Sequence, residues 1–345
     1  MLTISILYPK LIITDYMTLI AESTIFFGSI IVLALSSYVV VRSSVRIARI
    51  TRLGELTIGF IVLSIATTLP EMIVSTTAIV SGDIGISIGN ILGSNIANIC
   101  LIIGLVGLIR PVRMAEQTLM KLTLMLFLCS VIIIIFLISS SLGNITGIAL
   151  LLLFLVFSLY SLKKKINLGE IRLEEELVKL LKFKFTFGLK KTLFLFIAGL
   201  ILTIISSKFV VDSASSIASI LGIAGSVIGA TIIAVGTSLP ELSTSLNAVR
   251  ENHLRLGLGN TIGSCLTNLT LVLGLILLVS PSPVDMNRYT TLLAFVLIST
   301  ILLWIFLGGY GRKKLERKEG LVLLIVFIVF LIMIYYFPLP GLGFS

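Results

Sequence analysis

The stretches "TTLPE" at residues 67–71 and "TSLPE" at residues 237–241 lie in apolar sequence and repeat the same unusual residues. Proline interrupts the hydrogen bonding of a helix, and a charged side chain at the centre of a bilayer costs at least about 2.5–3.5 kcal/mol. The second copy follows the first by 170 residues. This repetition indicates two related halves, each of which supplies one carboxylate to a shared site.

The rest of the chain is apolar enough to be embedded in a membrane. It has 345 residues, of which 57% are hydrophobic and 12% are charged, and its mean hydropathy is +1.17. Soluble domains are about 45–50% apolar and about 25% charged. Runs of roughly 20 apolar residues can cross the hydrocarbon core as helices. We expect ten spans, approximately at 18–41, 56–80, 86–109, 118–139, 145–162, 192–211, 217–249, 256–280, 289–307 and 320–337.

The distribution of positive charge predicts how these spans are oriented. With ten spans, 23 of the 26 Lys and Arg residues fall on one side of the membrane, nine of them in residues 163–191. The other side receives Lys10, Lys208 and Arg288. Cytoplasmic loops carry such an excess of Lys and Arg. We therefore expect a cell-membrane protein in which the loop of residues 163–191 lies in the cytoplasm and both termini lie outside the cell. The net charge of +10 therefore reports topology rather than a nucleic-acid partner.

An internal duplication supports the division into halves. Residues 58–108 align with residues 228–278 without a gap, and 17 of the 51 positions are identical. Five spans per half is an odd number, so the second half enters the membrane from the opposite side. The predicted fold is therefore an all-α polytopic membrane protein of ten transmembrane helices arranged as two inverted five-helix repeats. We expect an N-terminal extension (1–17), a first repeat (18–162), a cytoplasmic linker (163–191) and a second repeat (192–345).

The repeated motif concentrates oxygen atoms. Pro70 and Pro240 lack an N–H group and leave a backbone carbonyl without its helical partner, which is tolerated where the backbone lines a polar cavity. Thr67 precedes Glu71 by four residues, as Thr237 precedes Glu241, so each pair shares a helix face. Carboxylate, hydroxyl and carbonyl oxygens are hard ligands that suit Na⁺ or Ca²⁺ rather than zinc or copper.

The following span of each half adds a second polar face. In "GNILGSNIAN" Ser94 and Asn98 are four residues apart, and in "GNTIGSCLTN" so are Ser264 and Asn268. The glycines of these stretches are spaced as in closely packed transmembrane helices. We expect these two spans to pack against the spans that carry the glutamates.

Other chemically active residues do not form a competing site. Cys100, Cys129 and Cys265 fall within apolar spans without metal-ligand spacing, and the single histidine, His253, falls in a predicted cytoplasmic turn. The sequence has no Asp-rich, Ser/His or zinc motif of a membrane-embedded enzyme. Within the linker, residues 173–187 are either an amphipathic helix on anionic lipid or a solvated charged segment.

The two motifs closely resemble the α-repeats of the cation/calcium exchanger superfamily, in its sodium/calcium exchanger branch. That family has G-T-S-L-P-E followed about twenty residues later by G-N-x-x-G-S-N, and this chain has "ATTLPE…GNILGSNIAN" and "GTSLPE…GNTIGSCLTN". Cys265 replaces an asparagine of the family pattern. Asn268 stands where potassium-dependent members have an acid, and so argues against K⁺ dependence.

The resemblance implies a Na⁺/Ca²⁺ antiporter that works by alternating access, without a cofactor or an obligatory protein partner, and functional as a monomer. It implies that Glu71 and Glu241 are shared by a central Ca²⁺ site and neighbouring Na⁺ sites. The further implied ligands are Thr67, Thr68, Ser94, Asn98, Thr237, Ser238, Ser264 and Asn268, with the backbone carbonyls of Ser64 and Ala234. The usual family ratio of three Na⁺ to one Ca²⁺ implies electrogenic exchange.

Three alternatives remain at this stage. A proton/calcium exchanger of the same superfamily has glutamate within the second helix of each repeat, where this chain has Gly, Ser and Asn. A transporter of Mg²⁺ or another divalent cation stays open because the sequence does not define the size of the cavity. An ion channel is a weaker alternative, because a pore is normally built by subunits around an axis rather than by inverted halves.

Overall fold

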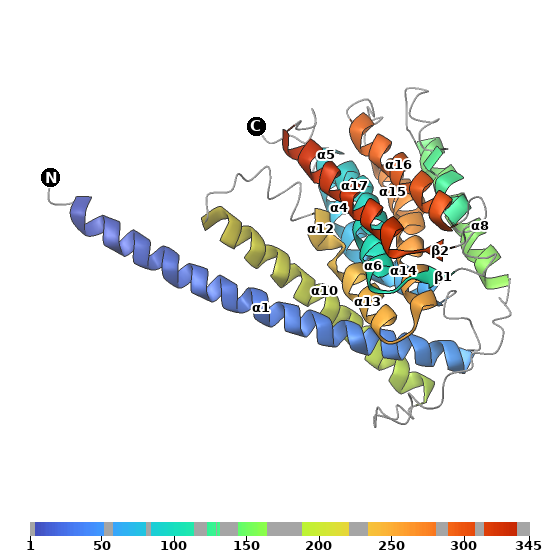
Figure 1. Ribbon diagram of the computed structural model, residues 1–345, viewed down its shortest axis with the longest axis horizontal. Coiled ribbons are helices and arrows are strands. Elements are labelled where there is room, and N and C mark those ends of the chain that lie inside the picture. Colours follow the sequence, from blue (N-terminus) through green and yellow to red (C-terminus); the bar gives the residue numbers. More distant parts are fainter. Residues whose placement is uncertain are drawn as a thin grey trace.

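A computed structural model describes residues 4–51, 58–80, 84–113, 123–128, 130–131, 144–163, 188–220, 234–280, 289–307 and 314–336. These residues are almost entirely helical (Figure 1). The elements of the first half are α1 (Ile4–Thr51), η1 (Ile58–Leu63), α3 (Ser64–Thr67), α4 (Leu69–Val80), α5 (Ile84–Ile96), η2 (Ala97–Ile103), α6 (Gly104–Ile109), β1 (Val112–Arg113) and α8 (Asn144–Lys163). Those of the second half are α10 (Leu189–Ile220), α12 (Ala234–Thr237), α13 (Leu239–Arg250), α14 (Leu254–Thr267), η4 (Asn268–Val272), α15 (Leu273–Val279), α16 (Thr290–Leu307), β2 (Lys314–Leu315) and α17 (Arg317–Tyr336). The η elements are π-helical turns. Cys129 and the segment 173–187 lie outside the described residues.

Several helices are long and apolar enough to cross a membrane. Among the described residues, five satisfy this criterion, and η1–α3 with α4 makes a sixth if the bent pair is one span. They lie at Met17–Ala48, Ser87–Ile109, Leu189–Val210, Leu254–Val279 and Thr290–Leu307. Helices α8 and α17 coincide with the predicted spans at 145–162 and 320–337. The helical membrane architecture is confirmed, and the count of ten spans stays a prediction.

Two helices differ from their predicted bounds. Helix α1 continues to Thr51, so Arg42 and Arg46 lie within the helix rather than in a loop. Helix α10 continues to Ile220, whereas we expected a break after residue 211. The expectation was wrong because "DSASSIASI" at 212–220 contains neither proline nor glycine, and nothing in it ends a helix.

Two layers can be distinguished around the motif helices. Helices α1 and α10 pack lengthwise against each other and lie along one side of the molecule, where α1 extends beyond the bundle (Figure 1). The other helices enclose the main apolar core, which α5, η2, α14, η4 and α16 line with fully buried Ile, Leu and Val side chains. Large apolar side chains on the outer faces, such as Phe27, Ile145 and Phe194, are 65%, 85% and 69% exposed, as expected for contact with lipid.

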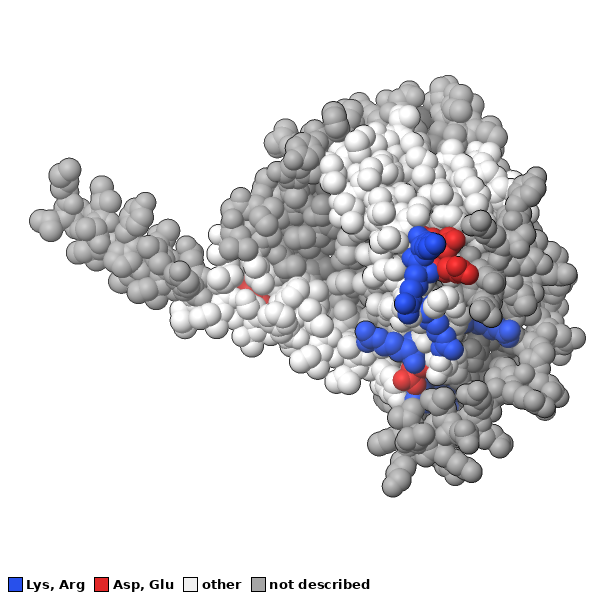
Figure 2. Space-filling view, viewed as in Figure 1, with Lys and Arg blue, Asp and Glu red and all other residues white. Residues whose placement is uncertain are grey.

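Helix ends that carry positive charge meet on one face of the molecule. Arg42 on α1 forms an ion pair with Glu251 after α13, and Arg110 after α6 donates a hydrogen bond to Asn252. Strands β1 and β2 pair antiparallel and join the end of α6 to the start of α17. Figure 2 shows Lys and Arg side chains gathered in this region of the visible face, while most of the described surface around them is uncharged. Four segments that the charge count assigned to the same side are therefore in contact.

Candidate cation site

Both proline-containing motifs interrupt their helix at the same position. In the first half α3 ends at Thr67 and α4 begins at Leu69, and in the second half α12 ends at Thr237 and α13 begins at Leu239. The intervening Thr68 has φ −79° and ψ −2°, and Ser238 has φ −86° and ψ 5°. These nearly identical backbone angles confirm that the two motifs break their helices alike, as the prolines predicted.

The two glutamates lie at these breaks and are bound by the opposite half. Glu71 and Glu241 are both completely buried. The Ser238 hydroxyl donates to Glu71 Oε1 over 3.3 Å, and the Thr68 hydroxyl donates to Glu241 Oε1 over 3.4 Å. Ser264 on α14 also donates to Glu241 Oε1, at 3.4 Å. Each carboxylate is thus held by a hydroxyl from the other motif, and the two motifs form one site.

A second pair of crosswise contacts surrounds the first. The Thr67 hydroxyl donates to Asn260 Oδ1 on α14 over 3.1 Å, and the Thr237 hydroxyl donates to Asn90 Oδ1 on α5 over 3.1 Å. Ser264 lies 3.5 Å from the Thr67 hydroxyl, and Ser94 lies 3.4 Å from the Thr237 hydroxyl. The predicted contact between the serine-bearing helices and the glutamate-bearing motifs is present in both halves.

Helices α5 and α14 change to π-helical geometry where their asparagines enter the site. Asn98 is the second residue of η2, and Asn268 is the first residue of η4. Such turns insert an extra residue into a helix and are frequent at functional sites. Both side chains are fully buried, and within the described part of the chain neither amide makes a hydrogen bond of normal geometry. Buried polar atoms without partners are rare in proteins and need an explanation.

Eight of the predicted ligands make hydrogen bonds or close polar contacts between the two halves. This cluster consists of the bonded set Thr67, Thr68, Glu241 and Ser264, the pair Glu71 and Ser238, and the pair Ser94 and Thr237. Asn98 and Asn268 follow the serines by one helical turn. The Ser64 carbonyl accepts the Thr68 N–H over 2.9 Å, and its hydroxyl donates to the Phe60 carbonyl. Ala234 is the first residue of α12.

Sequence analysis missed the two asparagines that bind the threonines. Asn90 and Asn260 occupy equivalent positions in the repeats, in the "GN" pairs of the aligned motifs. We assigned the polar role in those stretches to Ser94, Asn98, Ser264 and Asn268 and helix packing to the glycines, and Gly263 does pack closely against η1. The identical asparagines were the available signal, since a polar residue repeated within an apolar span is expected to have a polar partner.

The chemistry of the cluster suits a hard cation. Glu71 Oε2 and Glu241 Oε2 are buried and without a hydrogen-bond partner among the described residues, and no Lys or Arg of that part forms an ion pair with either carboxylate. The same part holds no group of three or more His, Cys, Asp and Glu residues that could hold a metal ion by themselves. Two carboxylates surrounded by hydroxyl and amide oxygens match the ligand preference of Ca²⁺ and Na⁺.

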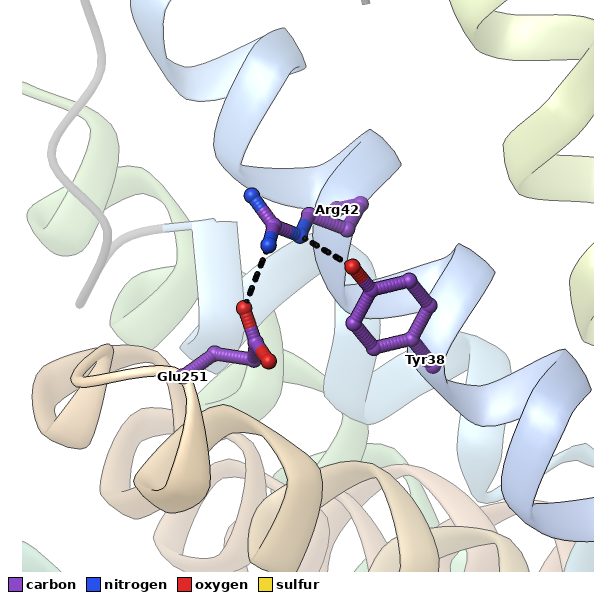
Figure 3. A network of polar contacts seen from close by, with 3 residues as sticks. All are labelled: Tyr38, Arg42 and Glu251. Atoms are coloured by element: carbon purple, nitrogen blue, oxygen red, sulfur yellow. Dashed lines mark hydrogen bonds and ion pairs between the residues drawn. The ribbon is translucent and has the colours of Figure 1, made fainter. Parts of the chain in front are cut away.

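A line of polar contacts joins α1 to the helix that carries Glu241. The Ser37 and Ser243 hydroxyls are 2.7 Å apart, and Asn247 Nδ2 donates to the Ser37 hydroxyl over 2.6 Å. One turn further on, Arg42 Nη2 lies 2.7 Å from Glu251 Oε2, while Arg42 Nε donates to the Tyr38 hydroxyl over 3.1 Å (Figure 3). We call these five contact residues and Tyr38 the α1–α13 seam.

Comparison with known proteins shows which family the chain belongs to. A family profile described as sodium/calcium exchanger protein matches residues 23–163 and 191–336. The chain is 33% identical over 329 residues to sodium/calcium exchanger MaX1 of Methanosarcina acetivorans, covering 86% of this chain and 93% of that protein. It is 32% identical over 327 residues to inner membrane protein YrbG of Escherichia coli, covering 92% and 98%.

A solved structure extends the similarity to three dimensions. The sodium-calcium exchanger NCX_Mj, soaked with 2.5 mM Na⁺ and 0.1 mM Ca²⁺, aligns with a TM-score of 0.76 at 31% identity, over 90% of this chain and 97% of that one. The profile, the relatives and the structure agree with the motif geometry. This polytopic membrane protein therefore belongs to the sodium/calcium exchanger protein family, in the prokaryotic branch of the cation/calcium exchanger superfamily.

Proposed function

We propose that this protein exchanges Na⁺ for Ca²⁺ across a cell membrane, with Na⁺ influx driving Ca²⁺ extrusion. The observation that carries the proposal is the arrangement of the two glutamates. Glu71 and Glu241 come from different motifs, and each accepts a hydrogen bond from a hydroxyl of the other motif. Two carboxylates balance the charge of one Ca²⁺ or of two Na⁺. The same shell can therefore hold either substrate, but not both together, and this competition is the basis of exchange.

Each predicted ligand has a place in this proposal. Glu71 and Glu241 bind the cation directly, and their oxygens that lack hydrogen bonds are available to it. The neutral oxygens come from Thr67, Thr68, Ser94, Asn98, Thr237, Ser238, Ser264, Asn268 and the carbonyls of Ser64 and Ala234. No cofactor is required, because the transported ions complete the site.

Na⁺ rather than H⁺ is the proposed coupling ion. The helices that follow the two motifs carry Ser94 and Asn98 in the first half and Ser264 and Asn268 in the second, and none of these side chains exchanges protons near neutral pH. Neutral oxygens bind Na⁺ by replacing its water shell. MaX1 is named a sodium/calcium exchanger, and NCX_Mj was soaked with Na⁺ and Ca²⁺. Both names support Na⁺ coupling.

The proposed topology is ten spans in two inverted halves with both termini outside. The halves correspond to residues 18–162 and 192–345, joined by a cytoplasmic linker at 163–191, and one chain is the functional unit. In support, Arg42, Arg110, Asn252 and the β1–β2 pair all lie on one face, as cytoplasmic segments should. We further propose that α1 and α10 move together against the bundle to switch access, because they pack most extensively against each other.

The proposal is tested by Ca²⁺ uptake into proteoliposomes that contain the full chain. We expect an outward Na⁺ gradient to drive uptake of radioactive Ca²⁺ at constant pH, and an outward H⁺ gradient without Na⁺ to drive none. Empty liposomes and liposomes with equal Na⁺ on both sides are the controls. Uptake driven by the H⁺ gradient alone would contradict Na⁺ coupling and favour the proton/calcium alternative.

A further inference from the structure

Asn90 and Asn260 hold the threonines of the opposite half in a defined orientation. Each asparagine lies on a helix of one half and accepts a hydrogen bond from a threonine of the other half. Thr237 donates to Asn90 Oδ1 and Thr67 donates to Asn260 Oδ1, each over 3.1 Å. A hydroxyl has one proton and two lone pairs. When the proton points into the amide, the lone pairs are free for another partner. The direction of these hydrogen bonds therefore decides whether a threonine can bind a cation.

The surroundings of Asn260 determine which of its amide atoms faces Thr67. Asn260 Nδ2 donates to the hydroxyls of Thr244 and Ser245 over 3.1 and 3.0 Å. Both hydroxyls have another acceptor for their own proton: Thr244 donates to the Pro240 carbonyl over 2.7 Å, and Ser245 lies 3.3 Å from the Gly257 carbonyl and 3.0 Å from the Thr261 hydroxyl. They can therefore accept from the amide, so Asn260 Oδ1 is turned toward Thr67.

Asn90 is oriented more directly. Its Nδ2 donates to the backbone carbonyl of Glu71 over 3.3 Å and to the Ser75 hydroxyl over 2.9 Å. A carbonyl cannot donate, and the Ser75 hydroxyl is within donating distance of the Ser87 carbonyl, at 3.3 Å. Asn90 Oδ1 is therefore turned toward Thr237, as the equivalent atom is turned toward Thr67.

We propose that Asn90 and Asn260 are positioning residues for cation binding. Each accepts a hydrogen bond from the hydroxyl of the threonine in the opposite half. The hydroxyl hydrogen then points away from the cation, and the threonine presents its oxygen lone pairs to the cation. The proposal rests on the proposed function, because it requires Thr67 and Thr237 to line the cation site. Supporting groups of this kind keep ligands in the productive geometry.

A difference between the halves next to the two asparagines predicts unequal effects of their loss. Val74 in the first half corresponds to Thr244 in the second. The Thr244 hydroxyl lies 3.2 Å from the Glu241 carbonyl and 3.1 Å from Asn260 Nδ2, so it stands between these groups. In the first half Asn90 reaches the Glu71 carbonyl itself. Loss of Asn90 should therefore weaken Ca²⁺ binding more than loss of Asn260.

A double-mutant cycle on the purified full chain tests the inference. The Ca²⁺ affinities of wild type, Thr67→Val, Asn260→Leu and the double variant are measured by calorimetric titration in detergent. If Asn260 acts through Thr67, each single change lowers the affinity by about tenfold and the double change also by about tenfold, rather than the roughly hundredfold of independent effects. Asn260→Ala is the second variant should the leucine variant fail to fold, and the same cycle applies.

Controls separate positioning from a general loss of structure. Thr300→Val on α16 removes a buried hydroxyl that, among the described residues, donates to carbonyls of its own helix, and it should leave Ca²⁺ affinity unchanged. Thr67→Val combined with Asn90→Leu, two residues between which the described structure has no hydrogen bond, should be close to additive. Additive effects for Thr67 with Asn260, or unchanged affinity in either single variant, would overturn the inference. Absence of Ca²⁺ binding by wild type would instead contradict the proposed function on which the inference rests.

Discussion

Gly263 is a residue at which α14 packs closely against η1 and the start of the first motif. A Cβ atom at this position would lie 2.6 Å from the Phe60 carbonyl oxygen and 2.8 Å from the Ser64 hydroxyl. Real Cβ atoms do not approach backbone oxygens so closely, and the backbone of η1 cannot withdraw as a flexible side chain could. The glycine therefore sets the distance between Ser264 and the cluster around Thr67.

Replacement of Gly263 should be costly for this reason. We expect Gly263→Ala to lower the free energy of unfolding by about 1–3 kcal/mol, the usual cost of overpacking. Thermal unfolding of the purified protein in detergent measures the effect. Gly28→Ala is the matched control, because nothing lies within 4 Å of a Cβ at Gly28 in α1. Alanine is the better helix former, so this control should be neutral or stabilising by up to about 1 kcal/mol. Equal stability of the two variants would contradict the packing account.

For individual residues, the sequence predicted which side chains belong to the site better than it predicted which side chains they contact. Thr67 and Glu71 share a helix face because they are four residues apart, and such spacing can be read from a sequence. The partners of Thr67 and Thr237 are 193 and 147 residues away. Which polar residues meet across the halves depends on tertiary packing, so Asn90 and Asn260 could be noticed as repeated but not assigned a partner.

At the scale of elements, the α1–α13 seam is a polar connection between α1 and the bundle. Its charged part, Arg42 with Glu251, is 27% and 22% exposed, so solvent screens the pair only in part. The guanidinium also lies over the Tyr38 ring, 5.2 Å from its centre. Packing of an arginine on an aromatic ring adds to the ion pair and limits its motion.

Removal of one charge of the seam should loosen this connection. We expect Arg42→Ala and Glu251→Ala each to lower the free energy of unfolding by up to about 1 kcal/mol, the range of partly exposed ion pairs. The exchanged pair Arg42→Glu with Glu251→Arg should recover part of the loss, whereas either reversal alone should be worse than alanine. Denaturation in low and high salt measures this, since screening should reduce the differences. Variants that are indifferent to salt would contradict an electrostatic role.

The predicted elements were accurate where the sequence contains a specific signal. Pro70 and Pro240 correctly predicted the interruptions at Thr68 and Ser238. The predicted break after residue 211 was wrong because residues 212–220, although more polar, contain no proline or glycine to end α10. The π-helical turns η2 and η4 carry no proline or other breaking signal, since their geometry depends on packing between helices.

At the scale of the whole molecule, the duplicated motif explains why the protein accepts two buried carboxylates. One motif offers half of a coordination shell, and the crosswise hydrogen bonds unite the halves into one shell. If three Na⁺ are exchanged for one Ca²⁺, as proposed from the family ratio, one net charge crosses the membrane per cycle. Each such charge is worth about 2.3 kcal/mol per 100 mV.

Exchange should therefore respond to membrane potential. In proteoliposomes with a fixed outward Na⁺ gradient, we expect an inside-positive potential, set by K⁺ and valinomycin, to accelerate Ca²⁺ uptake, because Na⁺ efflux then carries net positive charge outward. An inside-negative potential should slow it. Liposomes with valinomycin and equal K⁺ on both sides are the control. Uptake that is independent of potential would indicate an electroneutral ratio of two Na⁺ to one Ca²⁺.

The central claim is that Glu71 and Glu241 form a single cation site to which both halves contribute. Calorimetric titration of Ca²⁺ into wild type, Glu71→Gln and Glu241→Gln, each shown to be folded by its thermal unfolding, tests this most directly. We predict that wild type binds a single Ca²⁺ in competition with Na⁺. Each variant should lose at least about 100-fold in affinity, since every 1.4 kcal/mol of lost interaction is tenfold. Near-wild-type affinity in either variant, or two independent Ca²⁺ sites in the wild type, would contradict the claim.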